Sequence, residues 1–348
     1  MRSPEPPALT IAVDAMGGDH APGVVVEGAV EALREESGRR FSIALVGDEG
    51  AIRRELRRLP AGGLALTIVN APERVEMSEP AVSAVRRKRH SSIATAMTMV
   101  SEGSADAFVS AGHTGAVVTT ALVKLGRLRG VARPAIATVV PGTEGSCVLL
   151  DVGANAECKP HHLYQFAVLG SVYARRMLRV DSPRIALLNI GEEPNRGNDL
   201  AQAGHAMLAG SSLRFVGNVE GRDVFRGAAD VVVCDGFTGN VVLKFAESVL
   251  GTVAGHVRRE ILRDVRSRLG AFLLAPALGR LRARLDAAEV GGAPLLGVDG
   301  ACIIAHGSSS AKAIKNAIKV AERFVRLGVN DDIRIDLERR HAEFRDIR

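Results

Sequence analysis

Five glycine-rich segments carry polar side chains of the types that bind anions. Each follows a short apolar run, and they occupy residues 14–20, 110–115, 151–155, 189–193 and 235–240. The first N–H groups of a helix have no partner within it and carry partial positive charge, so a glycine-rich turn at that point binds phosphate or an oxyanion. Glycine and asparagine are also ordinary loop residues, so one such turn would decide little. Five at predicted strand ends favour a phosphate or oxyanion site.

The sequence lacks the other common signatures of catalysis and cofactor binding. No segment combines G-x-G-x-x-G with a following acidic residue, and no G-x-x-x-x-G-K-[ST] occurs, so neither a nicotinamide site nor a P-loop is predicted. There is no G-x-S-x-G segment and no evident cysteine–histidine pair to supply a nucleophile. There is also no H-E-x-x-H or carboxylate cluster, and we expect His161 and His162 to cap a helix. We therefore predict no metal and no cofactor.

Apolar runs that alternate with helix-like segments predict an α/β fold with a mostly parallel sheet. Unbroken apolar runs are typical of strands buried on both faces. The predicted strands are 9–13, 41–46, 64–69, 106–111, 135–140, 147–152, 184–190, 230–234 and 301–305, and the clearest helices are 23–36, 91–102, 114–125, 160–177 and 308–327. We expect one three-layer α/β/α sandwich over residues 8–342, with the five turns along one edge of its sheet.

Residues 241–288 interrupt this alternation and predict a projecting helical hairpin. Apolar residues recur every four positions from Val241 to Leu269, which predicts one long helix. Gly270 and an apolar tip follow, and a second, basic helix begins at Gly279. Such a hairpin suits an anionic membrane surface or an acidic carrier protein, and packing in a dimer interface is the alternative. The residues expected to make these contacts are Arg263, Arg266, Phe272, Leu273, Leu274, Arg280 and Arg284.

The composition is that of a globular protein. The 348 residues are 47% hydrophobic and 24% charged, which excludes a disordered chain. The net charge of +6 favours an acidic partner, but aromatic residues make up only 3%, which disfavours nucleic acid. Four widely spaced cysteines predict reduced thiols in the cytoplasm. We find no signal peptide, and no apolar run reaches the roughly 18 residues that would span a bilayer.

Eight ordered segments with recognisable motifs span nearly the whole chain. They are VDAMGGDHAP (13–22), SAVRRKRHSS (83–92), ADAFVSAGHTGA (105–116), LLDVGAN with KP (149–155 and 159–160), PRIALLNIGEE (183–193), GNVEGRD (217–223), DGFTGNVVLK (235–244) and GGAPLLGVDG with AHGSS (291–300 and 305–309). Together these segments resemble the bacterial phosphate acyltransferase family of phospholipid synthesis. The resemblance implies a homodimer with a fold like that of isopropylmalate dehydrogenase and phosphotransacetylase.

The resemblance also implies an activity. Long-chain acyl-(acyl carrier protein) and inorganic phosphate would give acyl-phosphate and free carrier protein, which feeds glycerol-3-phosphate acylation. The protein would then be cytoplasmic, peripherally attached to the membrane and near a glycerol-3-phosphate acyltransferase. There are three alternatives: a phosphotransacetylase-like enzyme that uses acyl-CoA, a dehydrogenase on the same fold, and a non-catalytic scaffold that docks lipid.

Attack of a phosphate oxygen on a thioester needs positioning and oxyanion stabilisation rather than a covalent enzyme intermediate. The expected catalytic residues supply charge, a donor to the thioester oxygen, or orientation: Arg196, Asn155, Asp235 and Asn240. The expected substrate- and phosphate-binding residues are His113, Thr114, Gly115, Lys159, Thr238, Gly239, Lys244, Arg86 and Ser91. The alternatives are a strand-end cap for Lys159, an N-cap for Asp235 and a solvated helix charge for Lys244. The basic run 86–92 is either a solvated face or a pocket or partner site, with Ser91 or Ser92 as an N-cap.

Two positions depart from the family pattern. His113 stands where asparagine is usual, and Arg196 stands where lysine is usual. Both residue types still bind anions, because an imidazole donates a hydrogen bond and a guanidinium binds phosphate through two. A mechanism that needs a neutral amine at position 196 is excluded.

Overall fold

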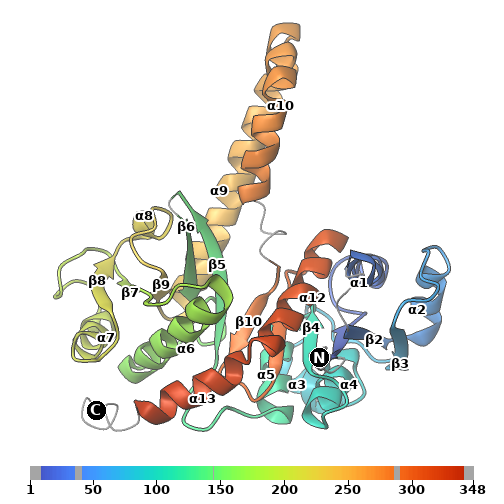
Figure 1. The fold of residues 1–348 in the computed structure, drawn as a ribbon, viewed down its shortest axis with the longest axis horizontal. Coiled ribbons are helices and arrows are strands. Elements are labelled where there is room, and N and C mark those ends of the chain that lie inside the picture. Colours follow the sequence, from blue (N-terminus) through green and yellow to red (C-terminus); the bar gives the residue numbers. More distant parts are fainter. Residues whose placement is uncertain (1–8, 36–40, 144, 286–290, 341–348) are drawn as a thin grey trace, which may run out of the picture.

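The computed structural model describes residues 9–35, 41–143, 145–285 and 291–340. One mixed sheet of 11 strands runs through the described chain (Figure 1), in the order β3-β2-β1-β4-β11-β10-β5-β6-β9-β7-β8. The strands are β1 (Leu9–Asp14), β2 (Phe41–Gly47), β3 (Leu66–Asn70), β4 (Ala107–Ser110), β5 (Ala135–Gly142), β6 (Gly145–Leu150), β7 (Ile185–Leu188), β8 (Phe215–Val219), β9 (Val231–Val233), β10 (Ala293–Leu296) and β11 (Ala301–Ile304).

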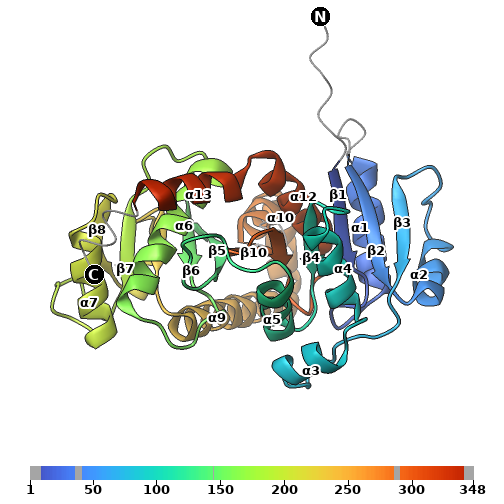
Figure 2. The same ribbon diagram turned by 90° about the horizontal axis from the view of Figure 1, so that it is seen from below.

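Helices cover both faces of this sheet. They are α1 (Gly23–Glu35), α2 (Glu49–Leu56), α3 (Ala81–Arg87), α4 (Ser92–Ser101), α5 (Thr114–Lys124), α6 (Pro160–Leu178), α7 (Asp199–Ala209), α8 (Gly221–Val224), α9 (Gly236–Arg263), α10 (Val265–Leu285), α12 (Ala311–Arg326) and α13 (Val329–Arg339). In β1, Ile11 and Val13 join the core under α1, α6, α12 and α13, whereas Ala12 joins the core under α4 and α5. Figure 2 shows α12 and α13 on one side and α3, α5 and α9 on the other. The three-layer α/β/α sandwich is confirmed.

All nine predicted strands overlap observed ones, but β8 and β10 were not predicted. Gly217 has a positive φ of 105° inside β8, where the register with β7 also shifts. β10 has only four residues and contains Pro294. Glycine and proline both weaken the apolar-run pattern that marks a strand.

The expectation that all five turns lie along one edge of the sheet is wrong. β10 is antiparallel to both β11 and β5, and β5 is antiparallel to β6. The strands β6, β9 and β7 therefore run opposite to β1, β4 and β11. The turns after β1 and β4 thus lie at the opposite ends of the strands from the turns after β6, β7 and β9. Apolar runs report burial and carry no information on strand direction.

The hairpin is confirmed, but its turn lies elsewhere. α9 ends at Arg263 and α10 begins at Val265, so the tip is at Asp264 (Figure 1). Oδ1 of Asp264 accepts a hydrogen bond from the N–H of Ser267 at 2.7 Å, which caps α10. The Arg268 guanidinium donates to the Leu262 carbonyl at 3.0 Å and so satisfies the end of α9. The predicted apolar tip lies inside α10, with Phe272, Leu273 and Leu274 on its exposed surface.

Some predicted positions lie outside what the structure describes. These are residues 8, 341 and 342 of the predicted domain, residues 286–288 of the predicted hairpin and the side chain of Arg284. Among the described helices, none is long and apolar enough to cross a membrane.

Candidate active site

The turns after β1, β4 and β11 form one group, the first cluster, built around Asp14. This carboxylate is 1% exposed and accepts a hydrogen bond from the Ser110 hydroxyl at 2.6 Å, and Ser110 Oγ in turn accepts one from the N–H of Gly112 at 2.9 Å. Burial raises the pKa of Asp14, and hydrogen bonds from Ser110, Ser92 and Met16 partly offset that effect. The buried Asp14 carboxylate therefore holds the turn after β4 in place through Ser110.

Close backbone approach fixes the glycines of the first cluster. A Cβ on Gly17 would lie 2.6 Å from Oδ2 of Asp14 and 2.7 Å from the Gly112 nitrogen. The N–H of Asp19 donates to the Gly307 carbonyl at 2.8 Å, which ties the turn after β11 to the turn after β1. Only glycine leaves room for these contacts.

The turns after β6 and β9 form the second cluster, built around Asp151. Asp151 is fully buried, and its two oxygens accept hydrogen bonds from the N–H groups of Ile136, Gly153, Ala154 and Asn155 at 2.7–3.1 Å. Burial raises the pKa of Asp151, and these hydrogen bonds partly offset that effect. Sequence reasoning missed Asp14 and Asp151 as organisers. Their shared signal is an aspartate at the end of an apolar run, directly before a glycine turn.

The first turn of α9 presses against the Asp151 loop. A Cβ on Gly236 would lie 2.6 Å from the Asn155 carbonyl oxygen, and one on Gly239 would lie 1.9 Å from the Asp151 carbonyl oxygen. Oδ1 of Asp235 accepts a hydrogen bond from the N–H of Thr238 at 2.9 Å, and Oδ2 accepts one from the Thr238 hydroxyl at 2.7 Å. The N-cap alternative for Asp235 is therefore confirmed, and Thr238 supports the cap.

Asn155 and Asn240 differ in what they can still bind. Asn155 Nδ2 donates to the Pro134 carbonyl at 2.7 Å and to Asp151 at 2.9 Å, so both of its amide hydrogens are used. Asn240 sits beside Gly153, and its side chain makes no hydrogen bond to any described residue. Of the two predicted donors to a thioester oxygen, only Asn240 has free N–H groups.

Two lysines supply positive charge to this side of the molecule. Lys159 precedes the first residue of α6 and is exposed, and Lys244 is exposed on α9 one turn after Asn240. Neither side chain forms an ion pair within the described ranges. Arg133 was not predicted, but its charge acts on the Cys158 thiol and His162 next to the same loop.

Arg196 lies in a separate loop after β7. Its Nε and Nη2 donate to the two carboxylate oxygens of Glu193 at 3.0 and 3.2 Å, and both side chains are more than half exposed. The hydrogen bond from Arg196 lowers the pKa of Glu193. Asn218, which sequence reasoning missed, is 5% exposed and donates to the Glu193 carbonyl at 2.8 Å, so it anchors the loop.

Ser91 and Arg86, both predicted to bind substrate, have different environments in the structure. Ser91 is 2% exposed and caps α4, because its hydroxyl oxygen accepts a hydrogen bond from the N–H of Ala94 at 3.3 Å. Arg86 is exposed on α3. The N-cap prediction for Ser91 is confirmed, and its hydroxyl is used by the cap rather than held toward a ligand.

No thiol among the described cysteines is poised to attack a substrate. All four are free; Cys147, Cys234 and Cys302 are buried, and Cys158 is half-buried beside the second cluster. Burial, reinforced by the charges of Asp151 and Asp235, raises the pKa of Cys158 to about 12. Because the thiolate is the nucleophilic form, Cys158 is inert near neutral pH.

The chain is similar to known proteins of one family along nearly its whole length. A family described as "Fatty acid synthesis protein" matches residues 9–332. The phosphate acyltransferase of Pelotomaculum thermopropionicum is 50% identical over 330 residues, covering 95% of each chain. That of Heliobacterium modesticaldum is 52% identical over 318 residues, covering 91% of this chain and 94% of the relative. The chain belongs to the phosphate acyltransferase family.

Solved structures show the same fold. A phosphotransacetylase from Streptococcus pyogenes has a TM-score of 0.58 at 18% identity and covers 92% of this chain and 94% of its own. A branched-chain phosphotransacylase from Enterococcus faecalis has a TM-score of 0.53 at 14% identity and covers 91% of this chain and 99% of its own. The predicted phosphotransacetylase-like architecture is confirmed, and this phosphate acyltransferase family member is an enzyme.

The structure gives a physical account of the first departure from the family pattern. His113 caps α5, because its Nδ1 accepts a hydrogen bond from the N–H of Ala116 at 3.2 Å. An asparagine oxygen makes the same bond at an N-cap. With Nδ1 as acceptor, the neutral ring carries its proton on Nε2, so His113 keeps one donor beside the N–H groups of Thr114 and Gly115.

His162 makes the stability of this family member depend on pH. Its Nδ1 accepts a hydrogen bond from the N–H of Lys159 at 3.1 Å, so the capping prediction for this residue is confirmed. Burial lowers the pKa of His162 from 6.5 to about 4. The unfolded chain binds a proton that the folded chain rejects, so this contribution to stability falls as pH drops from about 6.5 toward 4. Urea unfolding measures the free energy of unfolding at pH 7 and at pH 5. We expect it to fall less between these two pH values in His162→Gln than in the unmodified chain. Equal losses would contradict the assignment.

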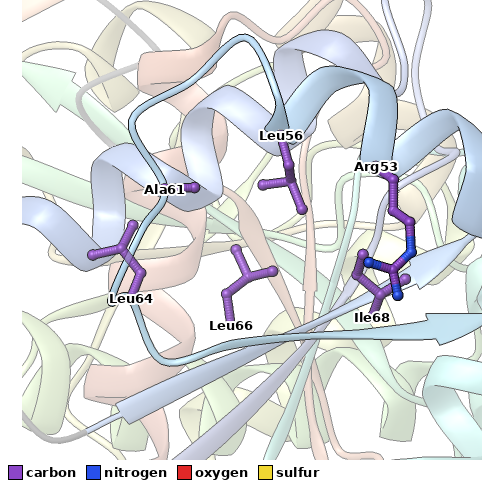
Figure 3. Close-up of a pocket in the computed structure, with 6 residues that line it drawn as sticks. All are labelled: Arg53, Leu56, Ala61, Leu64, Leu66 and Ile68. Atoms are coloured by element: carbon purple, nitrogen blue, oxygen red, sulfur yellow. The ribbon is translucent and has the colours of Figure 1, made fainter.

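A hollow lies between α2 and β3 (Figure 3), and no residue of either cluster lines it. It has a volume of about 290 Å³ and is lined by Arg53, Leu56, Ala61, Leu64, Leu66 and Ile68. Arg53 is already paired with Glu49 at 2.7 Å. The hollow offers an apolar wall at the edge strand and none of the predicted site residues.

Proposed function

We propose that this chain transfers a long-chain acyl group from acyl-(acyl carrier protein) to inorganic phosphate and releases acyl-phosphate and free carrier protein. Two glycine-rich helix N-termini carry the proposal, and none of the cysteines in the described part of the chain is poised for attack beside them. The chain is also 50% identical to a phosphate acyltransferase over 95% of its length. α5 and α9 cover the same face of the sheet (Figure 2). The product would feed glycerol-3-phosphate acylation in phospholipid synthesis.

In the proposed reaction a phosphate oxygen attacks the thioester carbonyl carbon. A tetrahedral oxyanion forms, the carbon–sulfur bond breaks, and the thiolate leaves and takes up a proton. Although α5 and α9 start at opposite ends of their strands, both cover one face of the sheet. The proposal therefore requires phosphate to lie between the two helix starts, held by the N–H groups of Thr114 and Gly115 and by the first turn of α9. Asn240 donates to the oxyanion, and Lys159 and Arg196 supply positive charge.

The test is to mix the protein with palmitoyl-(acyl carrier protein), with and without phosphate, and to trap acyl-phosphate as a hydroxamate. We expect hydroxamate only when phosphate is present. Nicotinamide-dependent turnover of a malate-like acid, or no phosphate-dependent hydroxamate at all, would overturn the proposal.

The proposed role of Arg196 predicts an effect of its substitution on the phosphate KM. A charge-assisted contact to phosphate is worth about 1.5–3 kcal/mol, so we expect Arg196→Ala to raise the phosphate KM by roughly tenfold or more. Glu193→Gln removes the competing carboxylate and should lower that KM. An Arg196→Ala variant with unchanged turnover and unchanged phosphate KM would rule out this role.

We also propose that the α9–α10 hairpin contacts the membrane surface and a second copy of the chain. Large apolar side chains are exposed along both helices, including Phe245, Val253 and Phe272, which supports packing against a partner. The tip is basic, with Arg263 and Arg266 on either side of Asp264. Charge reversal at both arginines should abolish binding to anionic liposomes at low salt while the oligomeric state stays the same. Unchanged liposome binding would reject the membrane contact.

A further inference from the structure

A patch that the proposed reaction does not use lies on and beside α3. We call Met77, Val82, Arg86 and Arg89 the α3 surface. Met77 is 54% exposed and Val82 is 55% exposed, and both arginines are exposed. Val82 and Arg86 are four residues apart on α3 and so share one face of the helix. An apolar centre with arginines is a composition enriched where proteins bind one another.

The positive charge of the α3 surface is not neutralised from within. The two other cations of the basic run 86–92 are neutralised by Glu79, which forms an ion pair with Lys88 and lies 3.9 Å from the Arg87 guanidinium. Arg86 and Arg89 form no ion pair or hydrogen bond through their side chains with the described part of the chain. Two free guanidinium groups therefore remain for a partner, whose contacting face must be acidic.

The α3 surface adjoins the first cluster. A Cβ on Gly115 would lie 3.2 Å from Cβ of Ala81, the first residue of α3. A Cβ on Gly307, in the turn after β11, would lie 3.7 Å from Cε of Met77. Figure 2 shows α3 standing outside α4 and α5, at the surface of the molecule. A protein seated on α3 would therefore border the turn that ends in His113–Gly115.

We propose that the α3 surface docks the acidic carrier protein that delivers the thioester. This inference rests on the proposed function, because it concerns the donor of that same site. A donor that is itself a protein must seat beside the turns where its acyl group reacts, and the α3 surface combines that position with uncompensated positive charge. A lipid surface is a poorer match, because α3 has only seven residues and two exposed apolar side chains carry the patch.

The first measurement is carrier-protein affinity, read by fluorescence anisotropy with labelled, unacylated carrier protein carrying its phosphopantetheine. We expect Arg86→Glu/Arg89→Glu to raise Kd at least tenfold at low salt, and the unmodified chain to lose affinity as salt increases. Arg54→Glu/Arg57→Glu is the matched control, because Arg54 on α2 and Arg57 directly after it are both exposed and form no ion pair with described residues. Its Kd should stay within twofold.

The second measurement is donor preference, the ratio of kcat/KM for palmitoyl-(acyl carrier protein) to kcat/KM for palmitoyl-pantetheine. We expect this ratio to fall at least tenfold in Arg86→Glu/Arg89→Glu. An unchanged Kd and ratio, or a loss of anionic-vesicle binding without a loss of carrier affinity, would overturn the docking site. No acyl-phosphate from either donor with the unmodified chain would instead overturn the proposed function.

Discussion

Gly239→Ala is expected to lose most of the acyl-phosphate-forming activity and about 3 kcal/mol of unfolding free energy. The added methyl group would lie 1.9 Å from the Asp151 carbonyl oxygen and 2.9 Å from the Cys234 sulfur. Both neighbours belong to buried residues, so the start of α9 must move away from the Asp151 loop. That movement displaces Asn240, which is the next residue.

A matched substitution separates this effect from helix propensity. Gly251 lies in the same helix, and a Cβ there would meet nothing within 4 Å. Alanine at an open helical position stabilises by about 1 kcal/mol relative to glycine. We therefore expect Gly251→Ala to be at least as stable and as active as the unmodified chain. Urea unfolding and hydroxamate formation measure both variants, and equal behaviour of the two would contradict the close packing of α9 on the Asp151 loop.

Asn240→Ala is expected to lower kcat by about 100-fold or more while stability stays within about 0.5 kcal/mol. The stability expectation follows because the Asn240 side chain makes no hydrogen bond to the described residues, so its removal leaves no buried group unpaired. The kinetic expectation follows because it is the predicted amide donor whose N–H groups are not already used.

Glu247→Ala serves as the control for Asn240→Ala. Glu247 is exposed on the same helix, two turns further along. It should leave kcat within twofold. A normal kcat in Asn240→Ala, or an equal loss in both variants, would remove Asn240 from the proposed mechanism.

The sequence predicts the elements of this fold better than their directions. Unbroken apolar runs predict strands that are buried on both faces, and all nine predicted strands overlap observed ones. The reversal of the sheet depends on two short antiparallel connections, one between β10 and β11 at residues 297–300 and one between β5 and β6 next to Gly145. An apolar run reads the same in either strand direction, so the pattern does not predict the reversal. The division of the turns into separate clusters follows from that reversal.

Some features of the hairpin and the site depend on local hydrogen bonds that the sequence pattern does not show. The four-residue apolar spacing predicts a first helix that runs to Leu269, with the tip at Gly270 and the apolar segment after it, but the Asp264–Ser267 cap stops α9 six residues earlier. The signal was present as an aspartate three residues before a serine. Asn155 and Asn240 look equivalent in sequence. Only three-dimensional packing shows that Pro134 and Asp151 already occupy the amide of Asn155.

In the proposed reaction phosphate itself attacks the thioester, with no acyl-enzyme intermediate. Single-turnover thiol release from palmitoyl-pantetheine, followed with and without phosphate and paired with intact-protein mass spectrometry, tests this claim most directly. We expect thiol release only in the presence of phosphate, together with a protein mass that never includes an acyl group. One equivalent of thiol released without phosphate, with a palmitoyl adduct on the protein, would contradict it.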